Sequence, residues 1–370
     1  MKKIIVYIVV SAAVISMCLG AAGCSTSTNV LAAQQSSENA DSTEKDEASG
    51  EVLSASRDIF AMDTYMTVEA YGDHCQEAVD QAEEEILRLD QMLSTGSISS
   101  EISKLNQDGY GTVSRDTFYL IQRSLELYQE TDGAFNIAVY PVMRAWGFTD
   151  QNYKVPDETE LKKLISDMDL TGVVLDEKTY RVQLANDEME IDLGGIAKGY
   201  TSSRIMDIFK SCKVESGMVS LGGNVQLYGA KADGSSWRVA IEDPNNLSGY
   251  AGILEAKNRA VITSGGYERY FEQDGKEYHH IIDPKTGYPA DNGLKSVTIV
   301  SADGTLADGL STSLFIMGKD RALEFWQAHS EEFDAVLIME DGSIYITEGI
   351  ENDFQTEQKS VIVRKEDSDE

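Results

Sequence analysis

The sequence is poor in cysteine, and this shortage excludes two classes of protein. Four cysteines occur in 370 residues, and two of them lie within the first 24. Only Cys75 and Cys212 remain, so neither a disulfide-stapled scaffold nor a CxxC zinc site is supported. The count allows one disulfide between these two residues, but two separate buried thiols suit so low a cysteine content better.

Positive charge is also scarce. The 31 Lys and Arg residues are outnumbered by 63 Asp and Glu residues, which gives a formal net charge of −32. Phosphates of nucleic acid would be repelled, so we expect no nucleic-acid partner and no electrostatic docking on anionic lipid. A substrate with a pyrophosphate would need a local exception to this charge, such as a metal ion.

The N-terminal apolar stretch is too short for a permanent membrane span. It covers residues 4–19, whereas a transmembrane helix needs about 20 apolar residues. A basic start, a short apolar core and a small-residue exit are typical of a secretory signal, which we assign to residues 1–23. Cys24 follows in a pattern that resembles a bacterial lipobox, with Ala21 where Leu is usual. We therefore expect a lipid on Cys24 that anchors the chain to the extracytoplasmic face of the cell membrane; ordinary secretion without the lipid is the alternative.

Composition divides the rest of the chain into three parts. Residues 24–56 are polar and acidic with few large apolar side chains, so we expect a flexible linker. Residues 57–350 are long enough to fold around one large core or two smaller ones and form the expected catalytic domain. Residues 351–370 have the character of an acidic tail, in which residues 361–363 are able to pair as an edge strand.

Hydrophobic periodicity predicts a mixture of helices and strands. We expect a strand over 59–71, then an amphipathic helix over 74–93. A short strand over 190–193 and a helix over 196–210 follow, and mostly strands come after residue 217. Because helices and strands do not alternate regularly, the sequence predicts an α+β fold instead of a doubly wound parallel sheet.

Two glycines in the segment 191–199 (IDLGGIAKG) predict a sharp turn between a strand that carries Asp192 and the next helix. A helix N-terminus presents unpaired N–H groups to phosphate, and Lys198 adds a positive charge there. The segment matches neither GxGxxG nor the Walker pattern, so the usual nucleotide-binding folds are not supported. A purely structural double-glycine turn is the alternative.

Two of the four histidines, His279 and His280, precede Asp-Pro and Thr-Gly turn signals in the segment 279–289. Imidazole titrates near neutral pH and is a natural general base. The alternatives are a turn in which one histidine caps a carbonyl, and a His/Asp metal site that has no obvious third ligand.

Asp308 and Thr312 lie four residues apart and share one face if the segment is helical. Their hard oxygen atoms suit Mg²⁺, which keeps phosphate oxygens and waters as its other partners. The alternative is that Asp308 is a helix N-cap. Aromatic residues in 131–136 (TDGAFN) and 146–148 (WGF) are able to sandwich a flavin or adenine ring, although aromatics are more often core residues.

Taken together and in order, these segments resemble the ApbE family of FAD:protein FMN transferases, and the resemblance covers essentially all of residues 60–345. This family implies a single α+β catalytic unit of the tunnelling-fold-like kind, with FAD in a cleft between two lobes. The motifs are AMDT (61–64), SEISKLN (100–106), TDGAF (131–135), DLGGIAKG (192–199), LGGN (221–224), residues 237–244, TSG (263–265), YERYF (267–271), HHIIDPKTGYP (279–289) and ADGLST (307–312).

The resemblance also implies a role for individual residues. It implies that His280 is the catalytic base. Mg²⁺, or Mn²⁺ in its place, would be bound by Asp308, Thr312 and the backbone carbonyl of Gly195. The residues implied to contact the flavin nucleotide are Met62, Ala134, Phe135, Asn136, Asp192, Lys198 and Ile282. Two positions depart from the family pattern: Asn136 stands where Asp is usual, and Asp63 stands where Gly is usual in Met-Gly-Thr.

The implied reaction is Mg²⁺-dependent transfer of the FMN moiety of FAD to a Thr or Ser hydroxyl of an acceptor flavoprotein, with release of AMP. Expected acceptors are extracytoplasmic flavoproteins, such as subunits of Rnf-type or sodium-pumping NADH:quinone (Nqr-type) complexes, or flavin reductases. An FAD pyrophosphatase would use the same site with water as the attacking group. A non-catalytic FAD-binding lipoprotein is a third reading, but the presence of His280, Asp308 and Thr312 together argues against it.

Overall fold

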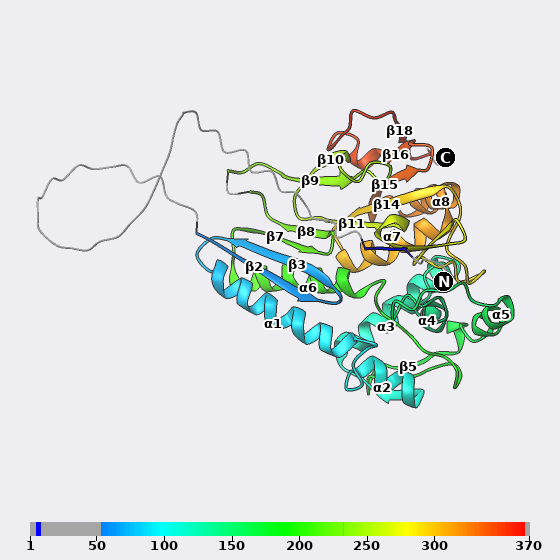
Figure 1. The fold of residues 1–370 in the computed structure, drawn as a ribbon. Coiled ribbons are helices and arrows are strands. Elements are labelled where there is room, and N and C mark those ends of the chain that lie inside the picture. Colours follow the sequence, from blue (N-terminus) through cyan, green and yellow to red (C-terminus); the bar gives the residue numbers. More distant parts are fainter. Residues whose placement is uncertain (1–4, 9–52, 232, 367–370) are drawn as a thin grey trace, which may run out of the picture.

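The computed structural model describes residues 5–8, 53–231 and 233–366. In this part of the chain a large sheet of nine strands forms the centre of the molecule (Figure 1). Neighbouring strands are antiparallel except for the pair at one edge of the sheet, residues 344–347 and 360–363, which is parallel. In spatial order the strands are β18 (Ser360–Val363), β16 (Ile344–Thr347), β15 (Phe333–Met339), β14 (Leu294–Ser301), β11 (Ala260–Gly265), β8 (Asn224–Tyr228), β7 (Ser216–Leu221), β3 (Thr64–Tyr71) and β2 (Ser54–Ala61).

Helices pack against these strands through their apolar sides. Helix α1 packs on β2 and β3, α6 on β7 and β8, α7 on β11 and β14, and α8 on β15. In α1 the buried residues recur every three or four positions, as amphipathic helices require. Each large apolar side chain buried in this way contributes about 1.5–3 kcal/mol. The helices are α1 (Cys75–Leu93), α6 (Ala197–Cys212), α7 (Gly304–Met317) and α8 (Lys319–His329).

A second apolar core lies between the large sheet and a small one. The small sheet consists of β17 (Phe354–Gln355), β10 (Tyr250–Ala256) and β9 (Trp237–Glu242). Side chains of β9 and β10 share this core with side chains of β7, β8 and β15. The central strands are therefore covered on both sides, and this accounts for their nearly continuous burial.

The segment between α1 and α6 forms a smaller, mostly helical lobe (Figure 1). Its α2 begins where the Ser100 side chain accepts a hydrogen bond from the Ser103 N–H and ends at Gly109 in the left-handed region (φ 74°). The elements of this lobe are α2 (Glu101–Asp108), β4 (Tyr110–Thr112), α3 (Arg115–Glu130), η1 (Ile137–Val139), α4 (Tyr140–Trp146), α5 (Glu158–Ser166), η2 (Leu170–Gly172), β5 (Val174–Asp176) and β6 (Arg181–Gln183).

A separate hairpin carries the two adjacent histidines. It consists of β12 (Arg269–Gln273) and β13 (Lys276–His279), follows the short helix η3 (Gly266–Glu268), and is extended by β1 (Ile5–Ile8). The four residues of β1 belong to the expected signal, and their backbone pairs with β12 in antiparallel orientation. The rest of residues 1–23, Cys24 and most of the expected linker lie outside the described residues, so the signal and the lipid stay predictions.

The α+β class is confirmed, and so are the helices expected around 74–93 and 196–210. The single strand expected over 59–71 is wrong: the chain turns at Met62 and Asp63, whose φ angles are 49° and 57°, and forms the hairpin of β2 and β3. The strand expected over 190–193 is also wrong. Here the Ile191 N–H donates to Asn106 Oδ1 instead of to a neighbouring strand.

The C-terminal part contributes β17, the short helix η4 (Glu348–Ile350) and the edge strand β18, which confirms the pairing expected for residues 361–363. Cys75 and Cys212 are both buried and unbridged, in agreement with two separate thiols. Over the described ranges, no helix is both long enough and apolar enough to cross a membrane.

Candidate functional site

Asp308 is the most constrained polar residue of the candidate site. It lies on α7 and is 4% exposed. Its Oδ2 accepts a hydrogen bond from the Gly199 N–H at 2.8 Å, and its Oδ1 accepts one from Asn224 Nδ2 at 3.0 Å. Burial raises the pKa of the Asp308 carboxyl, and the charge of Lys198 opposes this rise. The carboxylate is thus fixed by donors from α6 and β8.

The fixed position of Asp308 depends on a close approach of α6 and α7 at Gly199. A Cβ atom added to Gly199 would lie 2.1 Å from the Gly304 carbonyl oxygen and 2.5 Å from Asp308 Cβ. No side chain fits there without separating the two helices. The last glycine of the DLGGIAKG motif therefore brings the start of α6 into hydrogen-bonding range of the Asp308 carboxylate.

A group of hydroxyls lies beside Asp308. Ser264 Oγ is 2.8 Å from Ser311 Oγ and 3.2 Å from Thr312 Oγ1. Since α7 begins at Gly304, Asp308 and Thr312 share a helix face, as their spacing predicts. The alternative of Asp308 as the N-cap is wrong, because Asp303 accepts the N–H groups of Thr305 and Leu306 at the helix start.

His280 directly follows β13 and has a defined tautomer. Its Nδ1 lies 3.1 Å from the backbone carbonyl oxygen of Arg269, which also accepts the His280 N–H at 3.0 Å. A carbonyl only accepts, so Nδ1 carries the hydrogen and Nε2 keeps its lone pair. Burial, with the charge of Arg269 as the next cause, lowers the pKa of His280 to about 3. The imidazole is therefore neutral at physiological pH and has the form of a general base.

The charge of Lys198 acts on four other titratable residues of the site. Its charge lowers the pKa of Asp192, Glu268, Asp308 and His280, whatever the net shift of each group. For the three carboxyls the dominant effect is burial, which raises the pKa; that of Glu268 rises to about 7. These five residues come from three segments that lie far apart in the sequence, and the fold brings them together.

Three residues of the site were not singled out from the sequence: Asn224, Ser264 and Glu268. Each lies within a segment that carries the family resemblance, namely LGGN, TSG and YERYF. Their position in these segments was the available signal. Their roles depend on hydrogen bonds to α7 or, for Glu268, on the charge of Lys198, and the sequence shows neither.

Met62 lies in the turn between β2 and β3. Its N–H donates to Asp90 Oδ1 at 2.9 Å, and its sulfur lies 3.9 Å from Thr201 Oγ1 on α6. A non-glycine residue with φ of 49° is uncommon. The hydrogen bond that the Met62 N–H donates to Asp90 holds Met62 in this conformation, with its side chain against Thr201 of α6.

Ala134 and Phe135 are buried, and Phe135 packs on the glycine turn. A Cβ added to Gly195 would lie 3.3 Å from the Phe135 ring. Asn136 has a structural part: its Oδ1 accepts the Ala138 N–H at 2.8 Å, and its Nδ2 donates to the Met168 carbonyl at 3.0 Å. An Asp there would keep the first bond but could not donate the second, so this environment suits Asn at the position where the family pattern has Asp.

Ile282 is 4% exposed, belongs to the main apolar core and forms an isolated bridge with Pro289. Its observed contacts are those of a core residue. The structure does not bring its side chain into the group around Asp308 and Lys198, so its contact with a flavin nucleotide stays a prediction.

The donor set around Asp308 fits a magnesium ion. In the described ranges no group of three or more His, Cys, Asp and Glu residues is placed to hold a metal. Mg²⁺ usually takes one or two carboxylates and completes its shell with waters and substrate phosphates. Asp308 with the hydroxyl of Thr312 provides such a partial set of hard oxygens.

Comparison with known proteins shows the family to which this chain belongs. Residues 62–337 match the model of the ApbE family. Over 266 residues, 71% of this chain, the sequence is 35% identical to "FAD:protein FMN transferase" of Klebsiella pneumoniae (strain 342), of which 82% is covered. It is 32% identical over 319 residues to the protein of the same name from Treponema pallidum (strain Nichols), with 80% of this chain and 87% of that one covered.

Solved structures show the same relationship. The ApbE protein from Thermotoga maritima has a TM-score of 0.76 and 32% sequence identity, with 81% of this chain and 99% of that one covered. The flavin transferase ApbE from Vibrio cholerae has a TM-score of 0.73 and 27% identity, with 82% and 99% covered. The fold and the site define an α+β enzyme of the flavin-transferase class. The chain belongs to the ApbE family.

Proposed function

We propose that this chain transfers the FMN moiety of FAD to a Thr or Ser hydroxyl of an acceptor flavoprotein and releases AMP. The observation that carries the proposal is the neutral His280 imidazole, whose Nδ1–H is bonded to the Arg269 carbonyl and whose Nε2 keeps a lone pair. It lies in the same electrostatic environment as Lys198, as does the fixed carboxylate of Asp308. The names of the relatives support the same activity.

The His280 imidazole supplies the base that the transfer needs. Nε2 accepts the proton of the acceptor hydroxyl while the hydroxyl oxygen forms a bond to the phosphorus of the FMN half. The phosphorus–oxygen bond to the AMP half breaks, and AMP leaves with the electron pair. The hydrogen bond from Nδ1 to Arg269 keeps the ring oriented and stabilises the imidazolium that forms.

Positive charge at the site offsets the negative charge of the protein as a whole. Lys198 lies in the first turn of α6, near the N–H groups at the helix start, and Arg269 lies close enough to lower the pKa of His280. A pyrophosphate is stabilised by such groups. Lys198 and Arg269 therefore bind and orient the diphosphate of FAD despite the net charge of −32.

Asp308, Thr312 and the Gly195 carbonyl would hold Mg²⁺, or Mn²⁺ in its place. When bound, the ion would neutralise charge on the pyrophosphate and make AMP a better leaving group. Asn224 and the Gly199 N–H keep the Asp308 carboxylate in one orientation for this purpose. Ser264 does the same for the Thr312 hydroxyl.

The sequence also supports a proposal for the cellular location of the reaction. We propose that Cys24 carries a lipid and that the enzyme works on the extracytoplasmic face of the cell membrane, on acceptors such as Rnf- or Nqr-type subunits or flavin reductases. A mass spectrum of the protein from membranes would test this. A diacylglycerol on an N-terminal Cys24 is the expected result, and an unmodified chain that begins elsewhere would contradict it.

Transfer is tested by incubating the purified protein with FAD, Mg²⁺ and an Rnf-type subunit, with and without EDTA. The expected result is an acceptor mass gain of one FMN that requires the metal and equals the AMP released. FAD converted to free FMN and AMP without a mass gain would show a pyrophosphatase. FAD left intact with each acceptor class would contradict both activities and favour a binding protein.

His280→Asn provides the matched test of the base. The variant should lose transfer while its affinity for FAD stays within about twofold, because Asn keeps a donor for the Arg269 carbonyl but offers no basic nitrogen. Full transfer by this variant would overturn the assignment of His280.

A further inference from the structure

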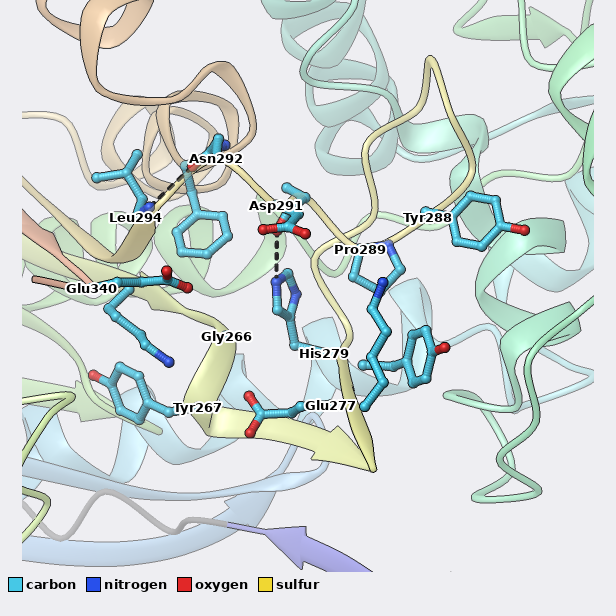
Figure 2. Close-up of a pocket in the computed structure, with 15 residues that line it drawn as sticks. Gly266, Tyr267, Glu277, His279, Tyr288, Pro289, Asp291, Asn292, Leu294 and Glu340 are labelled. Atoms are coloured by element: carbon cyan, nitrogen blue, oxygen red, sulfur yellow. Dashed lines mark hydrogen bonds between the residues drawn. The ribbon is translucent and has the colours of Figure 1, made fainter. Parts of the chain in front are cut away.

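His279 and His280 are adjacent, but their side chains serve opposite sides of the hairpin. His280 bonds to the Arg269 carbonyl on β12. In Figure 2, His279 points from β13 into a separate cavity of about 240 Å³ that Tyr267, Tyr288 and Asp291 help to line. His279 has no part in the proposed transfer, and the position of its partly buried imidazole therefore needs another explanation.

Both ring nitrogens of His279 are engaged by backbone groups. Nε2 lies 2.9 Å from the Ala290 carbonyl oxygen, and Nδ1 accepts the Ile281 N–H at 3.2 Å. Nε2 therefore carries the hydrogen, and the ring is a neutral donor and acceptor at once. Its two partners stand at the two ends of the segment 281–290, which begins immediately after His280.

Further hydrogen bonds make this segment a closed loop. The Ala290 N–H donates to the Ile281 carbonyl at 2.9 Å, and the Asp283 N–H donates to the Tyr288 carbonyl at 2.8 Å. At the tip, Trp146 Nε1 donates to the Gly287 carbonyl at 2.7 Å. The loop is thus rigid in itself, and the imidazole of His279 bonds both of its ends to β13.

The His279 ring packs against Gly266 and Phe315. A Cβ added to Gly266 would lie 2.7 Å from His279 Cδ2, so the ring lies directly on the Gly266 backbone. The Phe315 ring meets it edge-on, with 5.5 Å between ring centroids and an interplanar angle of 85°. Contacts with the Gly266 backbone and the Phe315 ring thus support the ring in the position that makes both hydrogen bonds.

We propose that His279 is a positioning residue for His280: by bonding both ends of the loop 281–290, it fixes the backbone on the C-terminal side of the base. The Arg269 carbonyl fixes the N–H and the ring of His280 from the other side. A base that moves by about 1 Å loses much of its rate advantage. The inference rests on the proposed function, because it needs His280 as the base.

Three variants of His279 test its hydrogen bonds to Ala290 and Ile281 separately. His279→Gln keeps a donor for Ala290, His279→Asn keeps an acceptor for the Ile281 N–H, and His279→Leu keeps neither. For the Leu variant we expect kcat for FMN transfer to fall at least tenfold while the KM for FAD changes less than twofold. The Gln and Asn variants should have intermediate kcat values. The matched control is His74, an exposed histidine just before α1 whose side chain makes no capping hydrogen bond: His74→Leu should leave kcat unchanged.

The ¹⁵N NMR spectrum of the imidazoles adds a measurement that does not depend on turnover. In the wild type His280 should show a single neutral tautomer with hydrogen on Nδ1, and in His279→Leu a mixture of both tautomers. Unchanged kcat and an unchanged His280 signal in a folded Leu variant would overturn the proposal. If the Leu variant does not fold, the Gln and Asn variants decide, and wild-type kcat in both would overturn it.

Failure of the inference and failure of the proposed function give different results. If the wild type transfers no FMN, the proposed function is wrong whatever the variants do. If the wild type transfers FMN and the His279 variants do so equally well, only the positioning role is wrong.

Discussion

The backbone carbonyl of Arg269 accepts two hydrogen bonds from His280, one from its N–H at 3.0 Å and one from Nδ1 at 3.1 Å. Both bonds come from one residue, so together they fix the backbone and the ring of His280 relative to β12. The same arrangement settles the tautomer, because only a protonated Nδ1 bonds to a carbonyl. The lone pair therefore stays on Nε2, and the ring does not need to reorient before it accepts a proton.

The low pKa of His280 predicts how transfer depends on pH. An ordinary histidine base would lose activity as pH falls through about 6.5, whereas the pKa of His280 is lowered to about 3. We therefore expect no acid limb at pH 6.5 in the single-turnover rate of transfer, measured between pH 5 and 8 with saturating FAD. A limb centred near 6.5 would show that the imidazole titrates normally and that its burial does not persist in the working enzyme.

The same shift has a consequence for stability. The folded-state pKa lies below the unfolded value, so the unfolded chain binds the proton first and the free energy of unfolding falls as pH drops from about 6.5 towards 3. His280→Asn should reduce this loss. Denaturant unfolding of both proteins at pH 7 and pH 5 measures it, and an equal loss in the two would contradict the shift.

We predict that Asn224, which follows a glycine turn, contributes both to the stability of the fold and to FAD binding. It is 4% exposed, and its Nδ2 donates to Asp308 Oδ1. Removing a donor from a buried carboxylate costs about 1–3 kcal/mol, so Asn224→Ala should lower the free energy of unfolding by that amount and weaken FAD binding in the presence of Mg²⁺. Denaturant unfolding and a titration with FAD measure the two effects. The exposed Asn245→Ala is the control; equal stability of both variants would contradict the role of Asn224.

The Glu268 carboxyl should change the free energy of unfolding with pH in the direction opposite to that of His280. Burial raises its pKa from 4.5 to about 7. Between these values the folded chain binds the proton more readily than the unfolded chain, so this carboxyl lowers the free energy of unfolding as pH rises through that window. Glu268→Gln should therefore be more stable than the wild type at pH 8, by about 1–3 kcal/mol after allowance for partial exposure, and equally stable near pH 4. Thermal unfolding of the metal-free protein at both pH values decides; no difference at pH 8 would refute the shift.

Local patterns in the sequence were sufficient to predict the helices and the α+β class. The heptad-like spacing of buried residues in α1, such as Val79, Ile86 and Leu93, depends only on local periodicity. The helical face shared by Asp308 and Thr312 was predictable for the same reason. The turn at Met62 was not, because it lacks the glycine that usually marks a tight hairpin turn.

The rest of the site depends on contacts between distant segments. The Asn224 side chain reaches Asp308 across 84 positions of sequence, and the Asn136 amide reaches the Met168 carbonyl across 32. Asp192 lies in the segment 190–193 that we expected to be a strand, and the Asn106 side chain takes the place of the missing strand partner. Side-chain bonds of this kind leave no periodic trace in the sequence, so only the folded structure shows them.

Asp63 offers a stabilising substitution at the rim of the site. It lies in the left-handed region with a φ of 57°, as does Met62 before it with 49°. Glycine adopts such angles without the steric cost of a Cβ, and the family pattern has glycine here; each left-handed non-glycine residue costs about 1–2 kcal/mol. The added freedom of glycine in the unfolded chain offsets part of that gain. Asp63→Gly should therefore raise the free energy of unfolding by about 0.5–1 kcal/mol, as denaturant unfolding would measure.

Gly147→Asp provides the converse control. This glycine has a φ of 78°, and a Cβ added to it would lie 2.2 Å from the Asn152 carbonyl oxygen. The Gly147→Asp variant should therefore be strongly destabilised. If Asp63→Gly proved less stable than the wild type, the Asp63 side chain would have a stabilising contact that outweighs its backbone strain.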